Sequence, residues 1–99
     1  MGTMEITSSK LNKSYVYKNE DLVVNGNYQQ NAESGALETI SGTCYRKDAQ
    51  GNQGDYVCNF NGYIRDEKMH YNMSDMSLDD TAIVVTAIGE IETWINENE

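Results

Sequence analysis

The apolar residues in the last quarter of the chain recur at the period of an α-helix. They are spaced by four, one, three and four positions and are Ile83, Ala87, Ile88, Ile91 and Ile95. Val84 and Trp94 widen this apolar stripe. Such a stripe is typical of a helix that packs one face against a core. We predict a helix over about residues 77–97, with Ser77 and Asp80 in the spacing of a capping box at its start.

Two features of this segment complicate the prediction. Residues 82–86 (AIVVT) are mostly β-branched, which favours a strand as the alternative. However, twenty residues without alternation or a turn signal exceed the length of an ordinary strand. Gly89 costs about 1 kcal/mol relative to Ala inside a helix. Because Gly89 borders the apolar stripe, we interpret it as a position where another backbone comes close.

Before residue 75 the chain consists of strand-like segments separated by turn-forming residues. We predict a short edge strand at 4–7, a polar linker at 8–14, and strands at 15–18, 21–30, 37–47, 55–65 and 68–74. Each predicted strand follows its predecessor across a short connection. Strands joined in this way form an antiparallel meander.

Opposite residues in a hairpin share a face of the sheet, so the turns allow the faces to be assigned. The predicted turns pair Tyr17 with Leu22, Tyr28 with Ile40, Cys44 with Cys58, Lys47 with Asp55 and Ile64 with Met69. The apolar face collects Tyr15, Tyr17, Leu22, Val24, Tyr28, Ile40, Cys44, Tyr56, Cys58, Phe60, Ile64, Met69, Tyr71 and Met73. Gly26, Gly42 and Gly62 also fall on the apolar face, where we expect the helix to cross. The opposite face, which we name the polar sheet face, includes Asn25, Asn27, Tyr45, Asn59, Asn61 and Tyr63.

These patterns predict an α+β fold: a curved antiparallel β-meander of five or six strands with one C-terminal α-helix packed on the concave face. Ninety-nine residues suit a single domain over 1–99, with the sheet at about 4–74 and the helix at about 77–97. We see no apolar run near 18 residues and no secretory signal, so we expect no membrane span and a cytoplasmic location. A disulfide between Cys44 and Cys58 would indicate secretion instead. The sequence leaves the disulfide and a reduced core pair both open.

The net charge of −9 is concentrated at one end of the chain. Residues 1–74 hold nine acids and seven bases, whereas residues 75–99 hold seven acids and no base. The acids that we name the acidic ridge are Asp79, Asp80, Glu90, Glu92 and Glu97. Such a ridge either keeps a small protein soluble or attracts a basic partner. Because Lys and Arg are not clustered, we expect no direct nucleic-acid binding.

Residues with catalytic or metal-binding chemistry are few. His70 is the only His, and no nucleophile or carboxylate stands at a motif spacing from it. Cys44, Cys58 and one His do not supply a tetrahedral zinc site. We therefore predict no catalytic residue, no metal ligand, no cofactor and no enzymatic activity.

Two functions from different classes remain. The leading one is a non-enzymatic protein–protein interaction module that presents the acidic ridge or the polar sheet face. Its specific version is a small acidic inhibitor of a basic, nucleic-acid-binding partner, such as a phage or mobile-element anti-defence protein. The alternative is a small-ligand-binding protein with a pocket between sheet and helix, lined by Tyr28, Met69, Tyr71, Met73 and Trp94. The edge strand predicted at 4–7 would also allow a homodimer.

Overall fold

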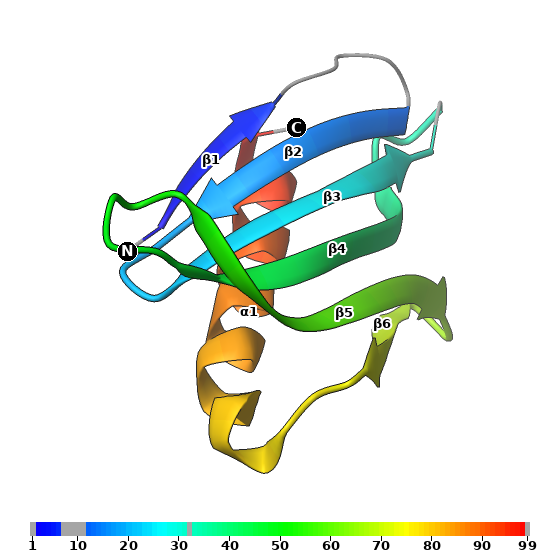
Figure 1. Cartoon of the computed structure of the whole chain (residues 1–99). Helices are drawn as coiled ribbons and strands as arrows, with labels where there is room; N and C mark the ends of the chain where they lie inside the picture. The colour runs from blue at the N-terminus through cyan, green and yellow to red at the C-terminus, as the bar shows by residue number, and fades with distance from the viewer. Residues whose placement is uncertain (1, 7–11, 32, 99) are drawn as a thin grey trace.

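The computed structural model describes residues 2–6, 12–31 and 33–98. Figure 1 shows a single sheet with one helix lying across it. The strands are β1 (Thr3–Ile6), β2 (Asn12–Lys18), β3 (Leu22–Gln30), β4 (Leu37–Lys47), β5 (Gln53–Arg65) and β6 (Lys68–Ser74). A 3₁₀ turn, η1 (Leu78–Asp80), leads into α1 (Thr81–Asn98). The sheet order equals the chain order and neighbouring strands are antiparallel, which confirms the predicted α+β meander.

The strand boundaries differ from the prediction near the N-terminus. Residues 12–14, expected in a linker, belong to β2, and the Ser14 hydroxyl donates to Asn27 Oδ1 at 2.8 Å. Asn12 and Ser14 suit this part of β2 because they lie on the polar sheet face. The remainder of the predicted linker, 8–11, and Thr7 of the predicted edge strand lie outside the described residues.

Two hairpins have the predicted register, and a third is shifted by two residues. Tyr28 pairs with Ile40 and Ile64 with Met69, as predicted. Tyr17, however, pairs with Val24 and not with Leu22. The turn is centred on residues 20 and 21, one position later than predicted. Asn19 Oδ1 stabilises it there by accepting hydrogen bonds from the backbone N–H groups of residues 21 and 22 at 2.8 and 2.7 Å. A shift of two residues preserves the face of every side chain.

The β4–β5 hairpin contains a bulge that reverses one predicted orientation. Cys44 pairs with Cys58, but Tyr45 pairs with Tyr56, and Lys47 pairs with Gln53 where Asp55 was predicted. The extra residue between the Cys44 and Tyr45 pairs is Val57, which is buried at 8 % exposure, and a second extra residue lies between Tyr56 and Gln53. Tyr56 therefore turns to the polar sheet face, where it is 46 % exposed. The prediction that Tyr56 faces the core is wrong.

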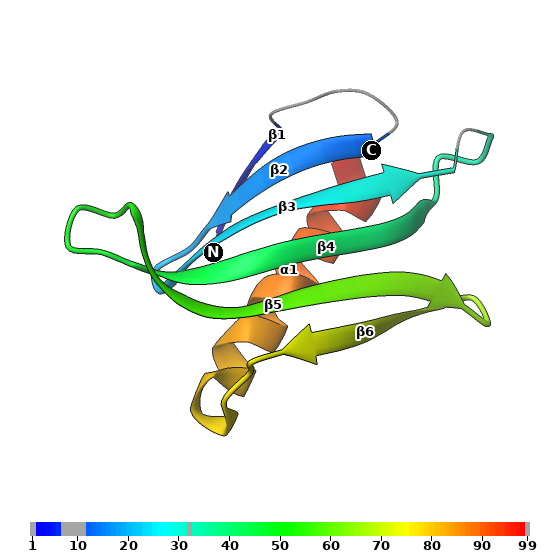
Figure 2. The ribbon, with the colours of Figure 1, turned by 45° about the vertical axis from the view of Figure 1, so that its right-hand side comes forward.

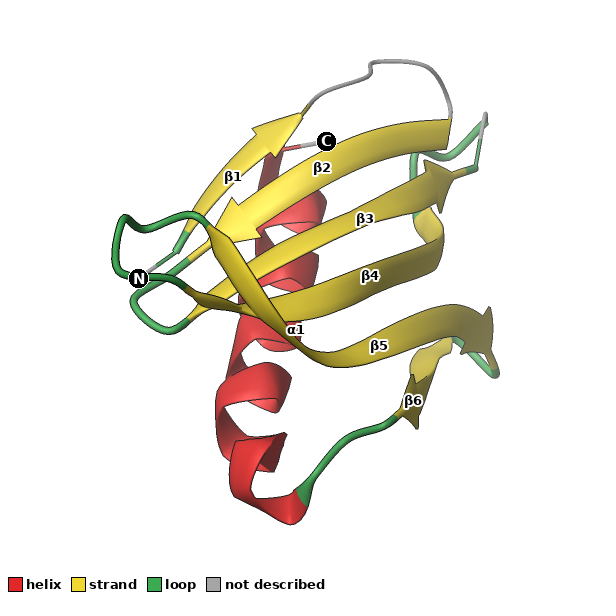
Figure 3. Ribbon diagram, viewed as in Figure 1, coloured by secondary structure: helices red, strands yellow, loops and turns green. Residues whose placement is uncertain are grey.

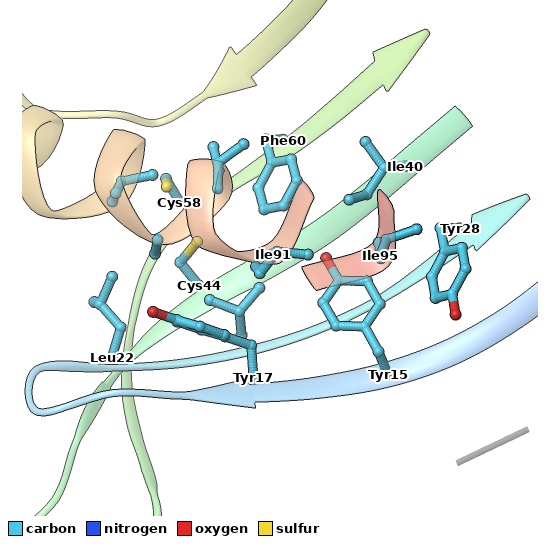
Figure 4. Close-up of a cluster of buried hydrophobic side chains, with 14 of the residues drawn as sticks. Tyr15, Tyr17, Leu22, Tyr28, Ile40, Cys44, Cys58, Phe60, Ile91 and Ile95 are labelled. Atoms are coloured by element: carbon cyan, nitrogen blue, oxygen red, sulfur yellow. The ribbon is translucent and has the colours of Figure 1, made fainter. Parts of the chain in front are cut away.

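The hydrophobic core lies between α1 and one face of the sheet (Figure 4). The helix contributes Val84, Ala87, Ile88, Ile91 and Ile95, so the strand alternative for 82–86 is wrong. Phe60 and Tyr28 are among the strand residues packed below the helix. Two predicted core residues are more open: Ile64, near the β5–β6 turn, is 44 % exposed and Met73, on edge strand β6, is 38 % exposed. The helix crosses the strands (Figure 2), and neither Ile64 nor Met73 belongs to the core cluster that it covers.

Gly42 and Gly62 on the apolar face make room for aromatic side chains, whereas Gly26 lies against the backbone of β4. A Cβ atom at Gly42 would lie 2.7 Å from the Phe60 ring and 2.8 Å from the Tyr15 hydroxyl. Tyr15 reaches from β2 across Gly26 on β3 and donates to the backbone oxygen of Ser41 on β4 at 2.8 Å. None of the three atoms nearest to Gly26, Gly42 or Gly62 belongs to α1. The nearest neighbours of these glycines therefore come from the strands of the sheet.

The start of the helix also differs in detail. The Ser77 hydroxyl donates to Asp80 Oδ2 at 2.9 Å and makes no hydrogen bond to a backbone N–H, so the predicted capping box is replaced by η1. Thr81 Oγ1 donates to the Ser77 carbonyl at 3.1 Å. Within the described residues, no helix combines the length and the apolar character needed to cross a membrane.

Candidate functional site

The polar sheet face lies on the side of the sheet opposite α1 (Figure 3). Its residues form rows that run across β2, β3, β4, β5 and β6. The central row is Ser14, Asn27, Ser41, Asn61 and Asn72. The neighbouring rows are Val16, Asn25, Thr43, Asn59 and Ser74, and Asn12, Gln29, Thr39, Tyr63 and His70. Tyr45 pairs with Tyr56 in the next row, so all six predicted residues share one surface.

Three adjoining hollows form a trough along β4, with volumes of about 260, 440 and 650 Å³. Short side chains of β4 supply the floor, namely Thr39, Ser41 and Thr43. Longer side chains of β3 and β5 supply the walls, namely Asn25, Asn27, Gln29, Asn59, Asn61 and Tyr63. The trough exists because the middle strand carries smaller residues than its two neighbours. Its lining consists mainly of uncharged amides and hydroxyls.

The amides of the trough differ in their hydrogen bonding. Asn25 Nδ2 donates to Gln53 Oε1 at 2.6 Å, and Asn59 Nδ2 donates to the Tyr56 hydroxyl at 3.0 Å. Asn61 is exposed, and its amide makes no hydrogen bond to another described residue. An amide offers both donors and an acceptor. Asn61 can therefore bond to a ligand without breaking a contact in the folded protein.

One aromatic pair lies in the row next to Thr43, and the other includes Tyr63, which lines two of the three hollows. The rings of Tyr45 and Tyr56 meet edge to face with centroids 6.2 Å apart. Tyr63 and His70 are stacked with centroids 6.0 Å apart, and His70 Nε2 lies 3.2 Å from the Arg65 carbonyl. His70 thus stands on the polar sheet face, next to Tyr63. Flat rings add apolar contact area to a surface that is otherwise polar.

The acidic ridge is divided among different parts of the molecule. Asp80 forms an ion pair with Arg46 and accepts a hydrogen bond from Ser77. Asp79 and Glu97 are exposed. Glu92 is two residues from Glu90, which places it about 200° around the helix, on the opposite flank of α1. The five acids therefore do not form one continuous free surface.

Glu90 is hydrogen-bonded to the edge of the sheet that β1 and β2 form. Its Oε1 atom accepts hydrogen bonds from the Tyr17 hydroxyl at 2.6 Å and from the Gly2 N–H at 3.0 Å. The Tyr17 hydrogen bond is the main reason that the pKa of Glu90 is lowered. Burial, together with the hydrogen bond to Glu90, raises the pKa of Tyr17 to about 12. Sequence reasoning missed this pair because 73 residues separate the partners.

A separate pocket of about 400 Å³ lies beside α1, against β1 and β2. It is lined by Gly2, Met4, Tyr17, Thr86, Gly89, Glu90, Thr93, Trp94 and Glu97. Of the five residues predicted to line a pocket, Trp94 lines this one, whereas Tyr28 is 1 % exposed in the core. Apart from its chain neighbours and the backbone of its own helix, a Cβ atom at Gly89 would have no heavy atom of the described residues within 4 Å. Our interpretation of Gly89 as a close backbone contact is wrong, because the residue opens onto this pocket.

Cys44 and Cys58 are directly opposed across β4 and β5, and both are buried free thiols. The reduced alternative is therefore the one found. Burial raises the pKa of Cys44 to about 12 and is also the main cause of the raised pKa of Cys58. Thiols of this kind are protonated at neutral pH and are weak nucleophiles.

Comparison with known proteins adds no relative. No model of a protein family matches the chain, and neither curated proteins nor solved structures yield a match. In the part of the chain that the structure describes, no three His, Cys, Asp or Glu residues gather as a metal site. The fold and the two surfaces define an α+β domain with an open polar sheet face and a smaller pocket on the flank of its helix.

Proposed function

We propose that this protein is a non-enzymatic interaction module that binds a protein partner through the polar sheet face. The observation that carries the proposal is the central row of Asn and Ser, which runs unbroken across five strands between two largely polar rows. Asn is depleted in strands, so its concentration on one face is unusual for a residue with a purely structural role. Amides and tyrosines together suit adaptable recognition of polar partner groups.

The dimensions of the face are consistent with this role. Strands are about 4.8 Å apart and alternate residues on one face about 6.8 Å apart, so five strands and four rows cover on the order of 600 Å². Each partner of a standard interface buries roughly 800 Å². The polar sheet face and the hairpins beside it approach this area.

The net negative charge of the chain lies mostly outside the polar sheet face. The two smaller hollows of the trough have no charged residue and the largest includes Glu38 and Glu67, whereas the whole chain has a net charge of −9. A negative molecule attracts a positive partner over distance, and a neutral polar surface then makes the contacts. We therefore propose a basic partner, and the inhibition of a nucleic-acid-binding protein is the specific version of this function.

A matched pair of variants tests which surface binds. Asn61→Arg places a long charged side chain in the centre of the trough, and Asn96→Arg makes the same change on an exposed position of α1. Both variants change the net charge equally. Immobilised wild type and both variants are used to capture proteins from a cell extract, and the retained proteins are quantified by mass spectrometry.

A protein retained by wild type and Asn96→Arg, but reduced at least tenfold with Asn61→Arg, supports the proposal. Equal losses with both variants would assign binding to net charge alone, and equal retention by all three would exclude the trough. Thermal unfolding of each variant, followed by circular dichroism, verifies that the sheet is intact.

A small-ligand-binding function remains the second candidate. The pocket beside Trp94 favours it, because its volume lies within the range of small-molecule sites.

A further inference from the structure

We infer that the pocket between α1 and strands β1 and β2 binds a small organic cation that carries an apolar body, such as an arylalkylammonium ion. This inference concerns a surface other than the polar sheet face. The two therefore succeed or fail separately.

The pocket is an opening at the margin of the core. Figure 1 shows the C-terminal half of α1 passing behind β1 and β2. Met4 of β1 and Trp94 of α1 are partly buried against the core and supply apolar walls. Gly89 supplies space, because no heavy atom lies within 4 Å of the place where its Cβ would be. A volume of about 400 Å³ accommodates one ring and a short chain.

The charge of the lining selects the kind of ligand. Two of the nine lining residues, Glu90 and Glu97, are carboxylates, and none is basic. They are seven residues apart on α1, so they lie on the same side of the helix about two turns apart. These two carboxylates repel an anionic ligand and attract a cationic one. An ammonium group satisfies them.

The carboxylate of Glu90 is held in one orientation and has a free oxygen for this contact. Tyr17 and Gly2 both donate to its Oε1 atom, which fixes the orientation of the carboxylate. Its Oε2 atom has no hydrogen-bond partner among residues 2–6, 12–31 and 33–98. The lowered pKa of Glu90 keeps the group ionised at neutral pH. The indole of Trp94 offers a π-face on which a cation or a ligand ring can lie.

The ligand chemistry can be tested with Trp94, the only tryptophan of the chain. The probe is 2-phenylethylammonium, and the matched neutral compound is 2-phenylethanol. Each is titrated into the full-length protein at low and high salt while the Trp94 fluorescence is recorded. We expect a saturable change with the ammonium compound and binding of the alcohol that is about tenfold weaker, the equivalent of one charge-assisted contact. High salt should weaken the ammonium compound alone.

Three variants locate the site. In the double variant Glu90→Gln, Glu97→Gln the affinity for the ammonium compound should fall about tenfold, whereas Glu92→Gln on the opposite flank should leave it unchanged. Gln keeps an oxygen that accepts the Tyr17 hydrogen bond, so the double variant retains this contact of the fold. Gly89→Leu fills the pocket without meeting another atom at its Cβ, and it should abolish the fluorescence response.

Equal binding of the ammonium compound and the alcohol would overturn the inference, since apolar partition would then explain both. Unchanged affinity in the double variant or in Gly89→Leu would also overturn it, because the ligand would lie elsewhere. The absence of any saturable response to the ammonium compound would show that the pocket does not bind this class of ligand.

Discussion

Tyr15 and Tyr71 both place a hydroxyl inside the protein, but only one of the two hydroxyls is satisfied. Tyr15 donates to the Ser41 carbonyl, whereas the buried Tyr71 hydroxyl has no partner among the described residues. A buried hydroxyl without a partner costs about 1–3 kcal/mol. We therefore expect Tyr71→Phe to leave the free energy of unfolding unchanged or to raise it, and Tyr15→Phe to lower it by about 1 kcal/mol.

Urea denaturation of both variants, followed by circular dichroism, measures the difference. Because the two substitutions remove the same atom, they differ only in the environment of that atom. A loss of stability in Tyr71→Phe comparable to that in Tyr15→Phe would show that the Tyr71 hydroxyl has a bonding partner.

Tyr17 and Glu90 should give the stability of the protein a defined dependence on pH. The pKa of Glu90 is lowered from 4.5, so its contribution is present above pH 4.5 and is lost as the pH falls through the folded value. The pKa of Tyr17 is raised from 10.0 to about 12, so its contribution is present below pH 10 and is lost as the pH rises toward 12. We expect the contribution of this pair to the free energy of unfolding to be flat between these limits and to fall on both sides.

Tyr17→Phe tests this dependence because it removes the hydroxyl that joins the two groups. The difference in unfolding free energy between wild type and Tyr17→Phe should be constant near neutral pH. It should shrink in acid, when Glu90 is protonated, and again in alkali, when the wild-type phenol ionises. A difference that is independent of pH would contradict the coupling of Tyr17 to Glu90.

At the scale of elements, the alternation of apolar and polar residues predicted the meander because a strand has a fixed period of two. The same reasoning failed near Tyr56, since a bulge inserts one residue and reverses the faces beyond it. Nothing in the residues around Val57 marks that insertion. The helix was predictable over its length, but what Gly89 faces depends on the path of β1 and β2, which lie more than 70 residues away in the chain.

Two glycine substitutions distinguish the packing of the helix from that of the sheet. Gly89→Ala should raise the free energy of unfolding by about 1 kcal/mol, because Ala has the higher helix propensity and its Cβ meets no atom within 4 Å. Gly42→Ala should lower it by about 1–3 kcal/mol, because its Cβ would crowd the Phe60 ring and the Tyr15 hydroxyl. Urea denaturation measures both. If Gly89→Ala lowered the free energy of unfolding, the original interpretation of Gly89 as a close backbone contact would be supported.

At the scale of the whole molecule, the sequence predicted the polar sheet face. It did not predict that the acids of the acidic ridge lie in different environments. All six polar-face residues were assigned to one side by parity, which needs only the hairpin turns. The acids of α1 share a composition but not an environment, since Asp80 meets Arg46 and Glu90 meets Tyr17 through tertiary contacts. Such contacts arise from how the helix crosses the sheet, which the pattern along the chain does not specify.

The charge distribution should destabilise the folded protein, and salt should relieve the effect. Glu97 lies in the last turn of α1, which contains no basic residue, so its charge opposes the helix dipole. We expect Glu97→Gln to raise the free energy of unfolding by about 0.5 kcal/mol at low ionic strength. The gain should vanish near 1 M salt, where the Debye length is about 3 Å. Glu33→Gln, in an exposed turn, changes the net charge equally and serves as the control.

A larger stabilisation by Glu97→Gln than by Glu33→Gln at low salt would show that Glu97 is retained at a position where it costs stability. Residues that violate a local rule without a compensating contact are expected at functional surfaces. Because Glu97 also lines the pocket beside Trp94, the cost would be consistent with a role in ligand binding. Equal effects of the two variants would assign the repulsion to the net charge of the whole chain, and the dipole argument for Glu97 would fail.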